Sequence, residues 1–231
     1  SMPESGQQTV RMWRVKILTT TWLSYAGFYF CRKNFSIAKS SLMSSMEIGR
    51  SDVAHIFTAY LAAYMIGQYL TGILGRRYAM RVLLLSGMAI TLGCNVAFGF
   101  TSLMGPAGYW PFLCLMVVNV FAQATGWPGN VGVLGNWLKK KERGRVMAAW
   151  ATCYQLGSII AKAFAAFMLG LAGAAWSFWG AAIVMLGIWV LFYVFQRDTP
   201  EDAGLSPLVE EVEVPVDEAA PVVEGGLIDR H

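Results

Sequence analysis

Apolar segments about as long as a lipid bilayer is thick recur along this chain and are separated by short polar stretches. The pattern predicts six helices, at about 17–40, 53–75, 82–103, 109–137, 146–171 and 174–196. Each segment contains the roughly 20 residues that a helix needs to cross the hydrocarbon core of a membrane. The expected fold class is therefore an all-α membrane protein with six transmembrane helices.

Composition and charge support this interpretation. Of the 231 residues, 56% are hydrophobic and only 14% are charged, whereas about a quarter of the residues in a soluble domain carry a charge. Basic residues gather before the first predicted helix, in alternate loops and after the last helix: Arg11, Arg14, Lys16, Arg76, Arg77, Arg81, Lys139, Lys140, Lys141, Arg143, Arg145 and Arg197. The other loops contain only Arg50. By the positive-inside rule, both termini are expected in the cytoplasm.

Three regions follow from these patterns. Residues 1–16 form a short cytoplasmic segment, residues 17–196 form the transmembrane bundle, and residues 197–231 form a cytoplasmic tail. The tail contains ten acidic residues against two basic ones and is rich in proline and glutamate. Such a composition predicts a flexible acidic linker.

The sequence gives no sign of catalysis. Cys31, Cys94, Cys114 and Cys153 all fall in apolar segments, where cysteine is expected to pack as a small residue rather than to form a disulfide framework or a metal site. No predicted helix contains a carboxylate pair, a metal-binding cluster or a nucleophile with its base. We expect no enzymatic activity, no metal, no cofactor and no nucleic-acid partner.

Basic residues nevertheless lie inside the membrane segments. The stretch YFCRKNF places Arg32 and Lys33 in the first predicted helix, with Lys39 near its end, and Lys162 lies in the fifth. A charge at the centre of a span costs about 2.5–3.5 kcal/mol, and no aspartate or glutamate lies in any predicted helix to pair with it. The unpaired positive charge indicates a bound anion. Alternatively, the side chain of Arg32 or Lys162 extends to a lipid headgroup or binds backbone carbonyls. We expect Lys39 to extend to a headgroup, and Lys33 could do the same.

Polar residues recur at helical spacing on four of the predicted helices. They are Tyr25, Tyr29, Arg32 and Ser36 in the first, Tyr60, Tyr64 and Gln68 in the second, Asn119, Gln123 and Asn130 in the fourth, and Tyr154, Ser158 and Lys162 in the fifth. Residues at this spacing share one face of a helix, as a central polar cavity requires, although tyrosine also occurs in the aromatic belts at membrane interfaces. The planar guanidinium of Arg32 matches the oxygen atoms of a phosphate or a carboxylate.

Small residues mark the fourth predicted helix. In GWPGNVGVLGNW the glycines are three residues apart, from Gly126 to Gly135, and such small residues let membrane helices approach closely. Pro128 permits a kink in the same helix. A close, bent helix suits a transporter that changes conformation, although static bundles use glycine as well.

Three stretches together resemble a known family. SYAGFYFCRKNF, GWPGNVGVLGNWLKKKERG and RDTPEDAGL are similar to segments of the organophosphate:phosphate antiporters of the major facilitator superfamily, which include glycerol-3-phosphate and hexose-phosphate transporters. The resemblance extends from about residue 17 to residue 207. It implies the N-terminal six-helix half of a major-facilitator fold, and a transporter that exchanges a sugar phosphate or glycerol 3-phosphate for inorganic phosphate.

The resemblance also implies a substrate site. By position, Arg32 is similar to the arginine that binds the substrate phosphate, and Lys33 is its neighbour. Tyr25, Tyr29 and Tyr64 are similar to cavity tyrosines of the family. The predicted substrate site also includes Gln68, Trp127, Asn130, Tyr154 and Lys162.

This sequence departs from the family pattern in several places. Tyr154 replaces a histidine of the glycerol-3-phosphate transporters, Gln68 replaces a lysine, and Lys162 takes the place of a proline. In the loop after the second helix, Arg76 stands where the superfamily usually has an aspartate that latches one conformation. The latch is then lost, or it uses another acid such as Glu142 or the acidic tail.

The length of the chain raises a further question. Members of this family have twelve helices in two six-helix halves, and the second half supplies a second substrate arginine. A six-helix chain therefore needs either a separate second half or a second copy of itself in a homodimer. Two other functions stay open, namely a sugar-phosphate sensor and a structural membrane subunit without a ligand. The expected location is a bacterial inner (plasma) membrane, or the endoplasmic reticulum membrane in a eukaryote.

Overall fold

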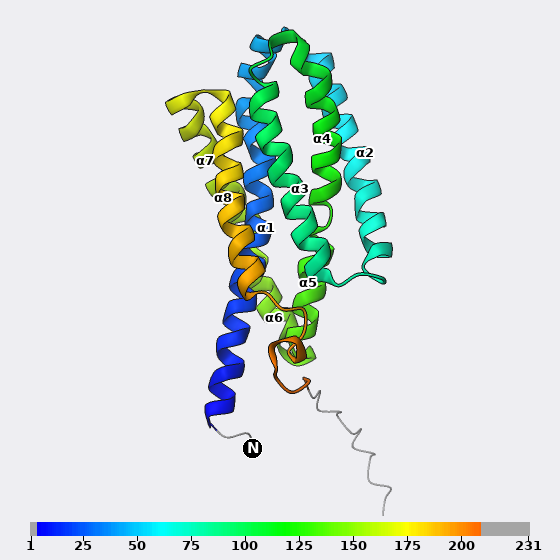
Figure 1. Ribbon diagram of the computed structural model, residues 1–231, viewed down its shortest axis with the longest axis vertical. Coiled ribbons are helices and arrows are strands. Elements are labelled where there is room, and N and C mark those ends of the chain that lie inside the picture. Colours follow the sequence, from blue (N-terminus) through cyan, green and yellow to red (C-terminus); the bar gives the residue numbers. More distant parts are fainter. Residues whose placement is uncertain (1–3, 209–231) are drawn as a thin grey trace, which may run out of the picture.

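The computed structural model describes residues 4–208, and these residues form helices and no strand. The helices are α1 (Glu4–Met46), α2 (Arg50–Leu74), α3 (Met80–Thr101), α4 (Tyr109–Gln123), α5 (Gly126–Trp137), α6 (Lys140–Trp150), α7 (Thr152–Ala172) and α8 (Ala174–Phe195), with short 3₁₀ turns at Gly105–Gly108 and Glu201–Ala203. They lie side by side in one bundle (Figure 1). The predicted all-α fold is confirmed.

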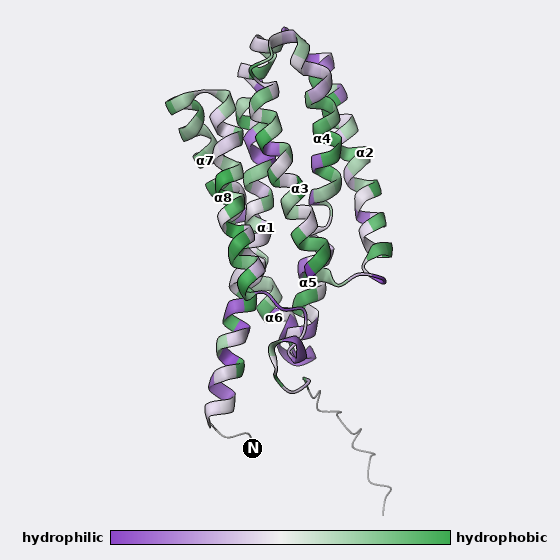
Figure 2. Ribbon diagram, in the orientation of Figure 1, coloured by the Kyte–Doolittle hydropathy of each residue, from purple (hydrophilic) through white to green (hydrophobic). Residues whose placement is uncertain are grey.

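Five helical segments are long and apolar enough to cross a membrane, judged by length and composition: Arg50–Leu74, Met80–Thr101, Gly105–Trp137, Lys140–Ala172 and Ala174–Phe195. These correspond to the second to sixth predicted helices. The first lies in α1, which is 43 residues long and is interrupted in its apolar stretch by Arg32, Lys33 and Lys39. The first turns of α1 are hydrophilic and extend below the bundle, whereas the bundle itself is mostly hydrophobic (Figure 2).

Two of the predicted helices are each divided in two. The segment 109–137 breaks at Ala124 and Thr125, between α4 and α5, and the segment 146–171 is joined at Ala151 to the shorter α6. Pro128 lies in the first turn of α5, where its missing N–H needs no partner within the helix. Gly126 allows α5 to approach α1, because a Cβ there would lie 2.8 Å from the ring of Phe28.

α1 is the central helix of the bundle. It packs most extensively on α7 and α8, while α3 packs on α8 and α4, and α2 packs mainly on α4. Large apolar side chains on the outer faces of α2 and α7, such as Met65, Tyr69, Phe167 and Leu171, are 64% to 72% exposed. An apolar exterior of this extent is what a bilayer, or another membrane segment, is able to cover.

Two tryptophans of α8 fasten it to α3. The indole Nε1 of Trp179 donates a hydrogen bond to the Val96 carbonyl at 3.0 Å, and Nε1 of Trp189 donates to the Leu85 carbonyl, also at 3.0 Å. The ring of Trp179 lies directly against Gly99, where any Cβ would overlap the indole. Gly99 is therefore required for the close approach of α3 and α8.

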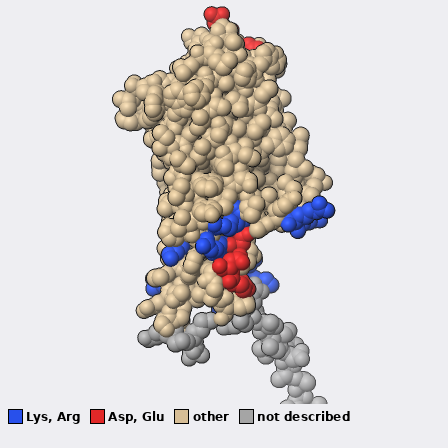
Figure 3. All heavy atoms as spheres, viewed as in Figure 1, with Lys and Arg blue, Asp and Glu red and all other residues tan. Residues whose placement is uncertain are grey.

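A cluster at the end of the bundle that carries the N-terminus joins distant parts of the chain. Arg14 of α1 forms an ion pair with Glu142 and donates to the Trp137 carbonyl from Nε at 3.2 Å and from Nη2 at 3.1 Å. The indole of Trp137 donates to the Arg197 carbonyl at 2.9 Å, and the Arg81 amide donates to Asp198 Oδ2 at 3.1 Å. Lysine and arginine side chains gather near this end (Figure 3).

This cluster bears on two expectations. Glu142 is paired with Arg14, and its use as the acid of a conformational latch stays a prediction. The predicted linker begins at residue 197, yet its first part is held against the bundle, where Ala203 and Leu205 pack on the core. Residues 209–231 of the predicted linker lie outside the described residues.

We expect Glu142→Gln to lower the melting temperature of the detergent-solubilised protein by about 2–4 °C or less. Glutamine keeps an acceptor for the Lys139 amide, which donates to Glu142 Oε1 at 3.1 Å, but it removes the charge opposite Arg14. A partly exposed ion pair contributes about 1 kcal/mol at most. Glu201→Gln is the matched control, because Glu201 is exposed. Equal shifts in the two variants would show that the ion pair contributes nothing measurable.

Candidate functional site

The cation of Arg32 lies among aromatic rings on α1 and α2. The guanidinium carbon is 5.0 Å from the centre of the Tyr29 ring and 5.1 Å from that of the Tyr64 ring. Both distances are within the range of cation–π attraction, which increases where the cation is shielded from water. The amine of Lys33 is 5.5 Å from the Tyr29 ring on the same helix.

Arg32 makes one hydrogen bond within the described chain. Its Nε donates to Oε1 of Gln123, the last residue of α4, at 2.9 Å. Its Nη2 is buried and has no partner among the described residues. No carboxylate among residues 4–208 pairs with Arg32, because the single ion pair in this range joins Arg14 to Glu142. The guanidinium therefore has donors available for an anion that comes from elsewhere.

An amide network supports the backbone of α1 beside Arg32. The Cys31 carbonyl accepts hydrogen bonds from three side-chain amides: Gln123 Nε2 at 3.2 Å, and Asn95 Nδ2 and Asn119 Nδ2 at 3.5 Å. Asn34 Nδ2 donates to Asn95 Oδ1 at 2.8 Å, and Asn34 Oδ1 accepts from the Phe35 amide at 2.8 Å. These amides are buried. Their hydrogen bonds give partners to polar groups that would be costly without one inside a membrane.

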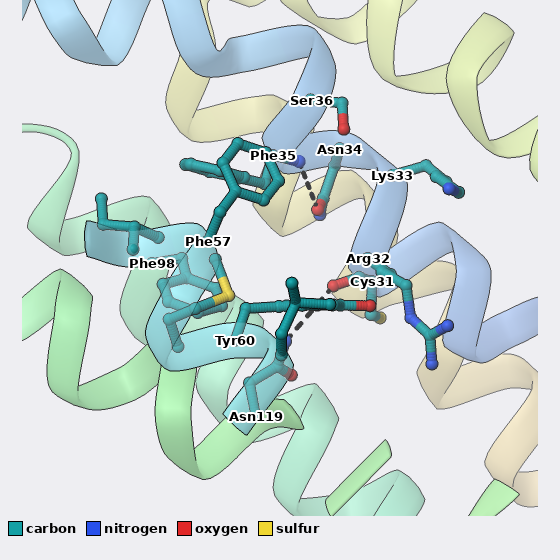
Figure 4. A pocket seen from close by; sticks show the side chains of 13 residues that line it. Cys31, Arg32, Lys33, Asn34, Phe35, Ser36, Phe57, Tyr60, Phe98 and Asn119 are labelled. Atoms are coloured by element: carbon teal, nitrogen blue, oxygen red, sulfur yellow. Dashed lines mark hydrogen bonds between the residues drawn. The ribbon is translucent and has the colours of Figure 1, made fainter. Parts of the chain in front are cut away.

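A cavity of about 240 Å³ opens between α1, α2 and α4 next to this network. Its polar lining comes from Arg32, Lys33, Asn34, Ser36, Tyr60 and Asn119, and its apolar lining includes Phe35, Phe57 and Phe98. Figure 4 shows the side chains of Arg32 and Lys33 leaving α1 in different directions, both away from Phe35 and Phe57. The cavity therefore has a cationic side and an aromatic side.

Several of the residues predicted from the sequence lie together. The ring centres of Tyr25 and Tyr29 are 5.4 Å apart, as are those of Tyr25 and Trp127. The rings of Tyr29 and Tyr64 flank the Arg32 guanidinium, and the ring contacts of Tyr25 connect Trp127 to this group. We call these five residues the Arg32 cluster.

Other predicted residues lie elsewhere. Asn130 is fully buried and donates to Ser24 Oγ at 3.4 Å, so it joins α5 to α1. Tyr154 is 40% exposed and accepts a hydrogen bond from Gln155. Lys162 is exposed on α7, and Gln68 is half-buried on α2. None of these four contacts the Arg32 cluster through a hydrogen bond, ring contact or cation–π contact in the structure.

The site also contains residues that were not among those predicted to bind substrate. Asn34 and Asn95 were not singled out at all, and Gln123, Asn119 and Tyr60 were recognised only as members of polar stripes. The sequence contains a signal for the amide residues. A side-chain amide in an apolar helix is costly without a partner, so its presence indicates a buried hydrogen-bond network. Residue spacing does not predict which group the amides bind, namely the Cys31 carbonyl in the middle of α1.

The fold and this site define a multi-pass membrane protein with a half-buried arginine in its bundle, whose buried Nη2 has no partner among the described residues. Residues 21–227 match the family model of the Major Facilitator Superfamily. The chain belongs to the major facilitator superfamily, within the group that contains the organophosphate:phosphate antiporters, and the resemblance to the N-terminal half of these proteins is confirmed.

Relatives with curated names support this placement. The chain is 32% identical over 223 residues to the membrane sensor protein UhpC of Escherichia coli, covering 95% of this chain and 49% of that protein. It is 31% identical over 206 residues to the putative glycerol-3-phosphate transporter 2 of Arabidopsis thaliana, covering 85% and 41%. It is 32% identical over 225 residues to the glucose-6-phosphate exchanger SLC37A2 of Xenopus tropicalis, covering 83% and 42%.

Two facts follow from these comparisons. The chain spans about half the length of the curated relatives it matches. The relatives are named as transporters, an exchanger or a sensor, and none of those quoted is an enzyme.

Proposed function

We propose that this chain is part of a transporter that exchanges a phosphorylated metabolite, a sugar phosphate or glycerol 3-phosphate, for inorganic phosphate. The observation that carries the proposal is the guanidinium of Arg32, which is held inside the bundle with a buried Nη2 that has no partner in the described chain. A buried donor without an acceptor costs about 1–3 kcal/mol, and more when it is charged. A phosphate group would supply the missing acceptors and the opposite charge.

The neighbouring residues have complementary roles in this proposal. Lys33 adds positive charge beside the phosphate, and Tyr25, Tyr29 and Tyr64 supply hydroxyl groups and ring faces around it. Trp127 packs on Tyr25 and closes one side of the cluster. Gln68, Asn130, Tyr154 and Lys162 remain proposed site residues.

The proposal includes a second component. The relatives are about twice as long as this chain, and the proposed translocation path therefore includes a second six-helix half or a second copy. In a homodimer, the symmetry axis would bring two copies of Arg32 to opposite sides of one cavity. Two facing cations favour a doubly charged phosphate over a singly charged acid.

A specific observation favours a second candidate function. One of the similar proteins, at 32% identity, is named a membrane sensor. A sensor would bind the same class of ligand through the same cation and would transmit occupancy to a partner instead of moving the ligand. A structural subunit without a ligand is the third possibility. It would leave the buried Nη2 of Arg32 without an acceptor.

We expect the purified chain in lipid nanodiscs to bind inorganic phosphate. We further expect proteoliposomes loaded with unlabelled phosphate to accumulate external radiolabelled phosphate, while proteoliposomes without internal phosphate do not. Native mass spectrometry of the same preparation reports whether the exchanging species is a dimer or contains a second half. Binding without counterflow by a preparation that native mass spectrometry shows to be a dimer, or to contain a second half, would support the sensor instead. Absence of binding by such a preparation would refute the proposal.

A further inference from the structure

Gln123 occupies an unusual position between the proposed phosphate-binding cation and the backbone of α1. Its side chain is 1% exposed and lies at the last residue of α4, directly before the break at Ala124 and Thr125. One end of its amide accepts a hydrogen bond from Arg32 Nε at 2.9 Å, and the other end donates to the Cys31 carbonyl at 3.2 Å. The amide is therefore used at both ends.

This arrangement leaves only one orientation for the amide. The Cys31 carbonyl can only accept a hydrogen bond, so it requires the NH₂ group of Gln123, and the guanidinium of Arg32 can only donate, so it requires the oxygen. A flipped amide would place two acceptors together at Cys31 and two donors together at Arg32. The hydrogen-bonding capacity of the two neighbours thus fixes Oε1 of Gln123 toward Arg32.

The fixed orientation of the Gln123 amide determines which edge of the Arg32 guanidinium is free to bind an anion. An arginine can bind a phosphate side-on, through Nε and one terminal nitrogen, or end-on, through Nη1 and Nη2. Gln123 already occupies Nε, whereas Nη1 and Nη2 have no hydrogen bond within the described residues. The rings of Tyr29 and Tyr64, 5.0 Å and 5.1 Å from the guanidinium carbon, further limit its rotation.

We propose that Gln123 is a positioning residue that holds Arg32 for end-on binding of a phosphate group through Nη1 and Nη2. This inference rests on the proposed phosphate-binding function of Arg32. A guanidinium oriented before the anion arrives loses less conformational freedom on binding, so the affinity is higher than for an arginine free to rotate.

The test compares two substitutions with opposite consequences. Gln123→Met keeps the length of the side chain but removes the acceptor, and Gln123→Glu keeps the shape but places a carboxylate against Arg32. Binding of inorganic phosphate to the purified full chain is measured by calorimetry, and the melting temperature reports folding. Gln8→Met is the matched control, because Gln8 is exposed in the first turns of α1.

Gln123→Met is expected to weaken phosphate binding by about tenfold or more, as is usual when a partner that orients a binding residue is lost. Gln123→Glu is expected to abolish binding at neutral pH, because the carboxylate neutralises Arg32 and competes with the anion. Binding should return as the pH is lowered and the carboxyl group is protonated. The ionisable groups around it are Lys33, Tyr25 and Tyr29 of α1, and Tyr60 and Tyr64 of α2; the parent protein measured over the same pH range accounts for them and for phosphate itself.

A structural role would give a different pattern, in which Gln123→Glu binds phosphate normally at neutral pH, and that result would overturn the inference. So would parent-like affinity in Gln123→Met while Arg32→Lys loses binding, an outcome that leaves the proposed function intact. If Gln123→Met does not fold, the pH dependence of Gln123→Glu decides the question. If the parent protein itself fails to bind phosphate, the proposed function fails and this inference fails with it.

Discussion

Replacing Arg32 with lysine is expected to lower the affinity for inorganic phosphate by about a hundredfold or more. The ammonium group keeps the charge, but it lacks the planar fork of donors that meets two phosphate oxygens at once. It also lacks the Nε that donates to Gln123 in the native protein. Each hydrogen bond to a charged group contributes about 1.5–3 kcal/mol, and the loss of two such bonds corresponds to this change in affinity.

Equilibrium dialysis with radiolabelled phosphate measures this effect directly. Arg50→Lys is the matched control, because Arg50 is an exposed residue at the start of α2 and lies outside the Arg32 cluster. The control should bind phosphate as the parent protein does. Undiminished phosphate binding in Arg32→Lys, with the melting temperature unchanged, would remove Arg32 from the proposed site.

Replacing Gly99 with leucine is expected to prevent the bundle from assembling normally. A side chain at this position overlaps the indole of Trp179 and displaces it from the Val96 carbonyl, to which Nε1 donates at 3.0 Å. Overpacking in a tight interface costs about 1–3 kcal/mol, and the loss of the hydrogen bond from the half-buried Trp179 indole adds about 0.5–1.5 kcal/mol. Such a loss is a large part of the total stability of most proteins.

The same helix supplies the control for this prediction. Gly93 is exposed on α3, and a Cβ there meets nothing within 4 Å. Gly93→Leu changes the propensity and hydrophobicity of α3 in the same way, and it should leave stability unchanged or raise it by about 1 kcal/mol at most. Melting temperature and the fraction of monodisperse protein in size-exclusion chromatography are the two measurements. Similar behaviour of the two variants would contradict the role of Gly99 in α3–α8 packing.

Residue spacing predicted the helices well and their interruptions poorly. The apolar segments located the bundle because a membrane-crossing helix is predominantly apolar over about 20 residues. The break before α5 is only partly visible in the sequence, since Pro128 indicates a bend while the break itself lies at Ala124 and Thr125. The join between α6 and α7 falls at Ala151, a residue that favours helix, and no local signal predicts it.

The candidate site was predictable as far as its cation and its aromatic face. Tyr25, Tyr29 and Arg32 share a face in any regular helix, and the structure brings their rings and charge together. The hydrogen bond between Arg32 and Gln123 depends instead on the relative placement of α1 and α4. Residue spacing within one helix contains no information about that placement. Many rotations of α1 against α4 would keep the polar face of each helix toward the bundle interior.

The central position of α1 has a consequence for the synthesis of the protein in the cell. α1 is synthesised before the other described helices and is the least suited of them to remain in lipid alone, because it contains Arg32 and Lys33. Its most extensive packing partners, α7 and α8, are the last of the described helices to be synthesised. During translation the first helix must therefore wait in the insertion machinery, or in a temporary complex, until its partners arrive. Nascent chains arrested before residue 152 should consequently remain cross-linkable to the translocon through α1, and chains extended beyond α8 should be released from it.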